Sequence, residues 1–277
     1  MAVSGLRVAT IGDNCIDFYV PPIGRAGVGG QALNVAVYWR RLGLISEYLG
    51  AVGNDEDGAT VLRALRAADV IADRVRVLPG TTGLTRFAIS PEGEREIVYE
   101  GLGVCADYAP SAEDLDHMSG ADYVHCAVLS DFRTPARELA RRGVRVSYDF
   151  SVVSETEDLE AFDTVFYGID TGPDESQAVE LASRAVASGA GLAVVTRGAH
   201  GSLVFDGDQV VRAQAMPVEP IDTCGAGDSF AATFLARRLE GATLESSLQD
   251  ASAAASRAVM NLGAWPQDLR PRQEVSA

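Results

Sequence analysis

The sequence contains no lysine: all 23 of its positively charged residues are arginines. A P-loop nucleotide-binding protein needs a lysine in its glycine-rich loop, and a protein kinase needs one on a core strand. A Schiff-base enzyme needs a side-chain amine. The absence of lysine therefore excludes all three classes.

Cysteine, histidine and long apolar runs are also scarce. The four cysteines are far apart with no Cys-x-x-Cys pair, and the three histidines show no metal-ligand spacing. We therefore expect reduced core thiols and no structural zinc site. No run approaches the roughly 20 apolar residues that span a bilayer, and no cationic leader precedes the first apolar strand. The expectation is a cytoplasmic protein with no membrane partner.

Acidic residues outnumber basic ones, which gives a formal net charge of −16. Such a chain repels a nucleic-acid backbone, so we expect no nucleic-acid partner. Any phosphate bound here must be held by local backbone N–H groups, a metal and a few arginines. The 277 residues suit one large α/β domain covering 1–277.

Strand-like and helical segments alternate along most of the chain. This rhythm predicts a three-layer α/β/α fold, in which helices cover both faces of a mostly parallel central sheet. The predicted strands are 6–11, 46–52, 123–128, 145–149, 164–167 and 192–196, and the predicted helices are 31–42, 58–68, 135–142 and 176–188.

Two segments, at about 15–27 and 82–104, interrupt this rhythm with additional strands. The second contains a hairpin that we expect to turn at Pro91-Glu92-Gly93. Strands inserted into a βα series usually cover the active face, so we predict a small β-sheet lid. Exposed lid edges often pair, which makes a homodimer through the lid an expectation. The polar tail 266–277 is expected to be loose.

The most informative motif runs from Asp222 to Asp228, with the sequence Asp-Thr-Cys-Gly-Ala-Gly-Asp. Its Gly-Ala-Gly turn opens a helical run, and free N–H groups at a helix start bind anions. Asp228, in the first turn, is either a capping carboxylate or a general base for a hydroxyl that attacks phosphate. The motif favours a kinase that acts on a small hydroxyl-bearing molecule.

Four ordered stretches resemble the PfkB, or ribokinase-like, family of carbohydrate kinases. They are Gly12–Asp17, Gly29–Ala36, Thr196–Gly201 and the motif at 222–228, and the resemblance extends from about residue 6 to 265. Within the family, residues 9–17 and Gly-Ala-Trp at 263–265 are most similar to kinases that act on fructoselysine. A ketohexose, ribose, 2-keto-3-deoxygluconate and a nucleoside remain alternative substrates.

The resemblance implies a role for each matching residue. Asp228 would be the base, and the N–H groups of Gly225, Ala226 and Gly227 would form the anion hole. The sugar would be bound by Asp13, Gly30 and Asn34. ATP would lie near Thr196, Gly198, Gly201, Gly225, Gly227 and Asn261.

The resemblance also implies bound cations, although the sequence matches the family's motifs imperfectly. Mg²⁺ would accompany ATP and be touched by Glu175, with Asp174 as the alternative. Asp222 and Thr223 would help to hold a monovalent cation such as K⁺. Thr233 stands where the family usually has glycine, which affects helix packing and leaves the catalytic end intact.

Two further possibilities stay open, and one motif is discounted. Arg95, in the predicted hairpin, is either a solvated charge or a clamp on the substrate. A catalytically silent sugar-binding protein on the same fold is an alternative of another class. Gly101-Leu102-Gly103-Val104-Cys105-Ala106 fits a dinucleotide pattern, but Pro110 follows too soon for the long helix that this pattern needs, so we interpret it as a chance match.

Overall fold

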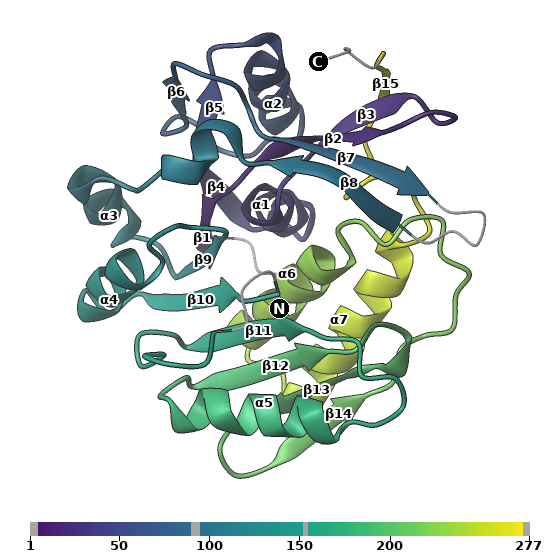
Figure 1. The fold of residues 1–277 in the computed structure, drawn as a ribbon. Helices are drawn as coiled ribbons and strands as arrows, with labels where there is room; N and C mark the ends of the chain where they lie inside the picture. The colour runs from purple at the N-terminus through teal and green to yellow at the C-terminus, as the bar shows by residue number, and fades with distance from the viewer. Residues whose placement is uncertain (1–4, 90–94, 152–154, 274–277) are drawn as a thin grey trace.

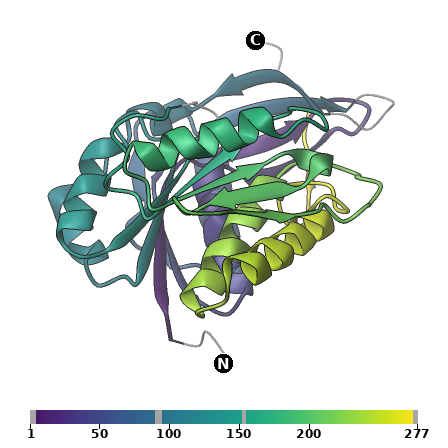
Figure 2. The ribbon, with the colours of Figure 1, turned by 90° about the horizontal axis from the view of Figure 1, so that it is seen from below.

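The computed structural model describes residues 5–89, 95–151 and 155–273. Its centre is an eight-stranded sheet, and Figure 2 shows helices covering both of its faces. In spatial order the strands are β14 (Val210–Ala213), β13 (Ser202–Phe205), β12 (Leu192–Thr196), β11 (Thr164–Gly168), β10 (Arg145–Asp149), β9 (Tyr123–Ala127), β1 (Arg7–Gly12) and β4 (Ile45–Leu49). The six strands from β12 to β4 are parallel, as predicted, while β13 and β14 form an antiparallel extension.

The two helical layers bury the two faces of this sheet in separate apolar cores. One face is covered by α1 (Gln31–Arg41), α6 (Ala226–Leu239) and α7 (Leu244–Ala258), and the other by α3 (Ala112–Met118), α4 (Arg133–Arg141) and α5 (Ser176–Ala187). Every residue of the central strand β9 is buried, which is typical of a strand covered on both faces. The predicted three-layer architecture is confirmed.

A second sheet projects from one end of the molecule (Figure 1), where the predicted lid strands lie. Its order is β15 (Arg270–Pro271), β3 (Arg25–Gly29), β2 (Cys15–Tyr19), β7 (Leu84–Ile89) and β8 (Arg95–Gly101). The expected turn at Pro91–Gly93 lies outside the described residues. Beside this sheet, α2 (Glu56–Ala67) follows the short strand β5 (Ala51–Gly53), which pairs with β6 (Arg76–Leu78).

The expectation of a loose tail is wrong for residues 266–273. Gln267 exchanges hydrogen bonds with the backbone of Val28, and β15 pairs with β3. Arg272 then forms a two-pronged ion pair with Asp57 on α2. The polar composition of the tail does not reveal these contacts, because each one joins the tail to a partner 215 or more residues earlier in the chain.

None of the helices in the described part of the chain has the length and apolar content that crossing a bilayer requires. All four cysteines are free thiols, three of them buried, which confirms the expectation of reduced thiols.

Candidate active site

The site begins where α6 starts, at the carboxyl end of the parallel strands. Gly225 precedes the helix with φ +72°, and a Cβ there would lie 2.1 Å from the Ala264 carbonyl oxygen. Only glycine fits both the positive φ and this close approach. The first-turn N–H groups have no intrahelical acceptor, and Asp228 stands among them with 6% exposure. The helix start thus combines anion-binding donors with a carboxylate.

Asn34 on α1 joins this carboxylate to the other predicted substrate residues. Its Nδ2 donates to Asp228 Oδ2 at 2.7 Å. The preceding turn passes through Gly30, at φ +111°, where a Cβ would lie 2.5 Å from the Asn14 Cα. The Asp13 carboxylate accepts the N–H groups of residues 31 and 32 at 2.9 and 3.0 Å. The structure therefore brings Asp13, Gly30, Asn34 and Asp228 to one place.

The side-chain oxygen of Asn34 accepts no hydrogen bond within the described part of the chain. This atom, Oδ1, is buried. A buried acceptor without a donor is costly, so it suits a ligand hydroxyl that would fill the gap. This orphaned oxygen lies on the side chain that already contacts Asp228.

Asp13 titrates unusually, and this gives a testable pH dependence. Burial raises its pKa from 3.8 to about 6, although the two backbone donors oppose the shift. Between these values the unfolded chain binds fewer protons than the folded one, so the free energy of unfolding falls as pH rises. The total fall from this group is about 3 kcal/mol for two pKa units.

We expect Asp13→Asn to remove this component of the pH dependence. Urea unfolding of both proteins between pH 4 and pH 8 measures it as the difference between the two stability curves. Asp73→Asn, on an exposed loop, is the control and should leave the pH dependence unchanged. A difference curve for Asp13→Asn that stays flat over this range would contradict the raised pKa.

A cavity of about 580 Å³ opens directly beside the start of α6. It contains four of the residues expected near ATP, namely Thr196, Gly198, Gly201 and Gly227, together with Ala226. Sequence reasoning missed the part of its lining that comes from the segment after β14, from α7 and from the residue that follows α7: Ala215, Met216, Pro217, Val218, Pro220, Ser252, Ala255, Ser256 and Val259. Met216 and Val218 are exposed apolar side chains suited to a flat ring.

Two other predicted nucleotide-side residues make protein contacts. Asn261 lies two residues beyond the cavity-lining Val259, and its Nδ2 donates to the Arg257 carbonyl. The Glu175 carboxylate accepts a hydrogen bond from Arg212 at 2.9 Å and lies 3.7 Å from Arg197. These two arginines lower the pKa of Glu175, which keeps it ionised. Its role towards a metal stays a prediction.

Asp222 is fully buried and ties three segments together. It accepts hydrogen bonds from the N–H groups of Cys224 and Gly263, both at 2.9 Å, and from the hydroxyl of Tyr19 on the lid strand β2. Thr223 lines the cavity. Asp222 thereby positions the turn before α6 relative to the lid.

Asp17 is a site residue whose role sequence reasoning missed. It lies on β2 with 4% exposure, and its carboxylate accepts hydrogen bonds from the thiols of Cys15 and Cys224. The signal was the alternation along β2, which places Cys15, Asp17 and Tyr19 on the face towards α6 and Ile16 on the other face. The lid therefore contributes a buried carboxylate to the site.

The remaining sequence features lie apart from this cluster or beyond description. After β8 ends at Gly101, residues Gly103–Asp107 form a 3₁₀ turn, which does not provide the long helix of a dinucleotide site. Arg95 begins β8, and its side chain lies outside the described part of the chain. Thr233 is buried within an uninterrupted α6.

Comparisons with known proteins agree with this geometry. The pfkB family carbohydrate kinase model matches residues 21–148 and 152–268. The fructoselysine 6-kinase of Escherichia coli (strain K12) is 35% identical over 263 residues, which cover 93% of this chain and 99% of that protein. A fructosamine kinase of Bacillus subtilis (strain 168) is 36% identical over 83% of this chain and 82% of its own length.

Solved structures show the same fold. Arabidopsis thaliana ribokinase, determined with ribose and ATP, superposes with a TM-score of 0.82 at 23% identity, covering 94% of this chain and 96% of that one. Adenosine kinase from Sinorhizobium meliloti gives 0.80 at 24% identity, covering 95% and 96%. The ribokinase-like fold and the resemblance found in the sequence are both confirmed: this chain belongs to the pfkB family of carbohydrate kinases.

Proposed function

We propose that this protein transfers the γ-phosphate of ATP to the 6-hydroxyl of a fructosamine such as fructoselysine. The observation that carries the proposal is the Asn34–Asp228 pair at the start of α6, next to a cavity large enough for a nucleotide. Full-length similarity to a fructoselysine 6-kinase and to a fructosamine kinase supports the choice of substrate. Ribokinase and nucleoside kinase relatives are less similar, at 28% and 27% identity.

In the proposed reaction, Asp228 takes the proton from the primary hydroxyl, whose oxygen attacks the γ-phosphorus in line while the bond from phosphorus to the bridging oxygen breaks and ADP leaves. Asn34 holds the carboxylate in place through its 2.7 Å hydrogen bond. The N–H groups of Gly225, Ala226 and Gly227 stabilise the charge on the transferred phosphoryl group. The adenine would lie in the apolar part of the cavity near Met216 and Val218.

Mg²⁺ suits this site mainly as a partner of the ATP phosphates, whose charge it would neutralise. The described residues contain no group of three acidic, histidine or cysteine side chains arranged to hold a metal by themselves. Glu175 and Asp174 remain the proposed protein contacts, through water. Asp222 and Thr223 remain the proposed neighbours of K⁺, which comparison of activity in potassium and sodium buffers tests.

We also propose that two copies associate through the lid. The edge strand β8 presents Ile97, Val98 and Tyr99, each more than half exposed. Exposed apolar residues on a sheet edge favour pairing with another strand. Sedimentation analysis of the purified chain tests this association.

The buried carboxylates favour a cationic substrate. Asp13 and Asp17 are both nearly inaccessible, and the charge of Asp17 contributes to the raised pKa of Asp13. The secondary amine of a fructosamine is protonated at neutral pH, so it would relieve this accumulation of negative charge. Neutral sugars of the same size lack that compensation.

We therefore expect fructosamines to give a kcat/KM at least about tenfold above that of fructose, ribose, 2-keto-3-deoxygluconate or adenosine. Asp17→Asn should reduce this preference because it removes one of the carboxylates that face the amine. ATP consumption against the panel measures both effects. If wild type and variant preferred fructosamines equally, Asp17 would have no part in recognising the amine. If the protein bound sugar without any turnover, it would be a catalytically silent binding protein.

A further inference from the structure

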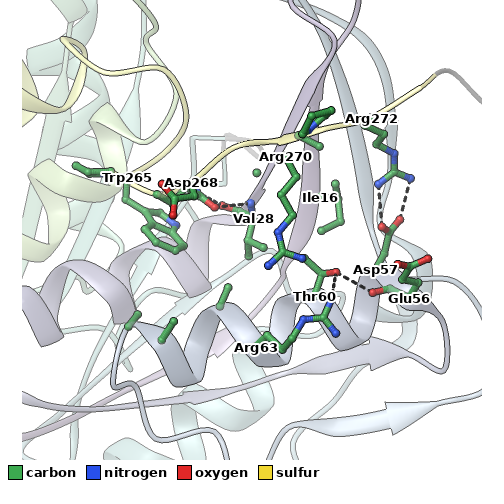
Figure 3. A pocket seen from close by; sticks show the side chains of 18 of the residues that line it. Ile16, Val28, Glu56, Asp57, Thr60, Arg63, Trp265, Asp268, Arg270 and Arg272 are labelled. Atoms are coloured by element: carbon green, nitrogen blue, oxygen red, sulfur yellow. Dashed lines mark hydrogen bonds and ion pairs between the residues drawn. The ribbon is translucent and has the colours of Figure 1, made fainter.

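A second cavity, of about 730 Å³, is lined by Ile16 of the lid strand β2 (Figure 3). Because side chains alternate along a strand, Ile16 faces away from the side of β2 on which Asp17 lies. The other walls of the cavity are α2, the lid strand β3 and the segment 265–273. This volume is in the usual range of small-molecule sites. Nothing in the proposed phosphoryl transfer uses it.

Arginines dominate the middle of this cavity. Figure 3 shows Arg63, from α2, and Arg270, from β15, extending into the same hollow. Arg63 donates to Thr60, and neither guanidinium forms an ion pair with any residue in the described ranges. Arg41 lies 5.5 Å from the centre of the Trp265 ring and donates to the Pro266 carbonyl.

The acidic side chains of the lining leave this middle region positive. Arg272 already neutralises Asp57, at 2.8 and 2.9 Å. Figure 3 shows Glu56 towards the same end as Asp57, and Asp268 towards the opposite end with Trp265. In a chain with a net charge of −16, guanidinium groups gathered without a carboxylate between them favour an external anion.

Trp265 supplies an independent indication of a ligand. Trp265 is only 6% exposed, and its Nε1 is buried with no acceptor among the described residues. Indole N–H is a donor only, so leaving it unpaired costs about 1–3 kcal/mol. Because Trp265 lines the cavity, a ligand acceptor there would complete its hydrogen bonding.

Part of the lining is apolar and suits the body of such a ligand. Small side chains at the C-terminal end of α2 form one wall, and two lid side chains contribute to another. These apolar residues are Ile16, Val28, Ala64, Ala67 and Ala68.

We propose that this cavity is a second ligand site, which binds an organic anion. Arg63 and Arg270 hold its acidic group, Trp265 donates to an acceptor on it, and the apolar body packs on the alanines of α2. A phosphate ester and a carboxylate share this chemistry. The site adjoins the catalytic turn, because Trp265 follows the Ala264 carbonyl that packs against Gly225.

Calorimetric titration of the full chain with phenyl phosphate and with phenylacetate tests the proposal. A saturating non-hydrolysable ATP analogue occupies the first cavity throughout, so that its anion hole is not titrated. Benzyl alcohol is the neutral control ligand, and inorganic phosphate tests the acid group alone. The readout is binding, so failure of the sugar kinase proposal would not affect the result.

We expect at least one of the two organic anions to bind saturably at millimolar concentrations or below, and benzyl alcohol to bind much more weakly. Arg63→Gln combined with Arg270→Gln should weaken binding about tenfold or more, and Trp265→Phe should weaken it severalfold. Arg66→Gln, exposed on the same helix and outside the lining, should have no effect.

Three results would overturn the proposal. They are no saturable binding of either anion, equal binding of benzyl alcohol, and unchanged affinity in the double arginine variant when its thermal unfolding matches that of wild type. Tighter binding of phenyl phosphate than of phenylacetate would identify phosphate esters as the ligand class, and the reverse order would identify carboxylates.

Discussion

Asp228→Asn is expected to lower kcat by about 10²- to 10⁴-fold, the usual contribution of a general base. The amide has nearly the same shape as the carboxylate, and its oxygen can still accept the hydrogen bond from Asn34, which is 2.7 Å long in the wild type. It cannot take a proton from the sugar hydroxyl. The loss should therefore appear in kcat, while binding of ATP and sugar changes little.

Steady-state kinetics and calorimetric binding on the same preparation separate these two effects. Asp208→Asn, at an exposed turn, is the matched control and should retain full activity. If Asp228→Asn kept more than about a tenth of the wild-type kcat, Asp228 would be a capping residue and not the base.

The sequence predicted the parts of this site that depend on local chemistry. A Gly-Ala-Gly turn followed by an apolar run specifies a helix start, and the structure begins α6 at Ala226. Asp13 at the end of the first strand and Asn34 near the start of the first helix were recognised for the same reason. Strand ends and helix starts in a parallel sheet meet at one edge, so the grouping of these residues followed from the fold class.

Other parts depend on contacts between distant segments, which no local pattern encodes. Asp17 is significant because β2 lies close to the turn before α6, where the thiol of Cys224 donates a hydrogen bond to the Asp17 carboxylate. The tail is ordered because Gln267 forms a hydrogen bond with the backbone of Val28 and Arg272 forms an ion pair with Asp57. Glu175 was proposed from the resemblance to an imperfectly matched motif, and only the structure shows that Arg212 already pairs with it.

The two glycines that flank Ala226 should respond in opposite ways to the same substitution. Gly225→Ala places a methyl group 2.1 Å from the Ala264 carbonyl oxygen, at a φ of +72° that side chains rarely adopt. We expect a loss of several kcal/mol in the free energy of unfolding, from backbone strain and overpacking together. Gly227→Ala meets nothing within 4 Å and lies inside α6, so it should be neutral or stabilising by up to about 1 kcal/mol.

Activity should nevertheless fall in both variants, for different reasons. In Gly225→Ala the helix start must move, and a shift of about 1 Å in a positioning group costs roughly a hundredfold in rate. In Gly227→Ala the helix stays in place, but the new methyl group occupies the cavity that Gly227 lines, where the phosphates are proposed to lie. Urea unfolding combined with ATP binding and turnover distinguishes the two cases. A methyl group at position 227 cannot be accommodated beside a phosphoryl group that the adjacent N–H groups hold. A Gly227→Ala variant that is stable and binds ATP as tightly as the wild type would therefore show that the phosphates lie elsewhere.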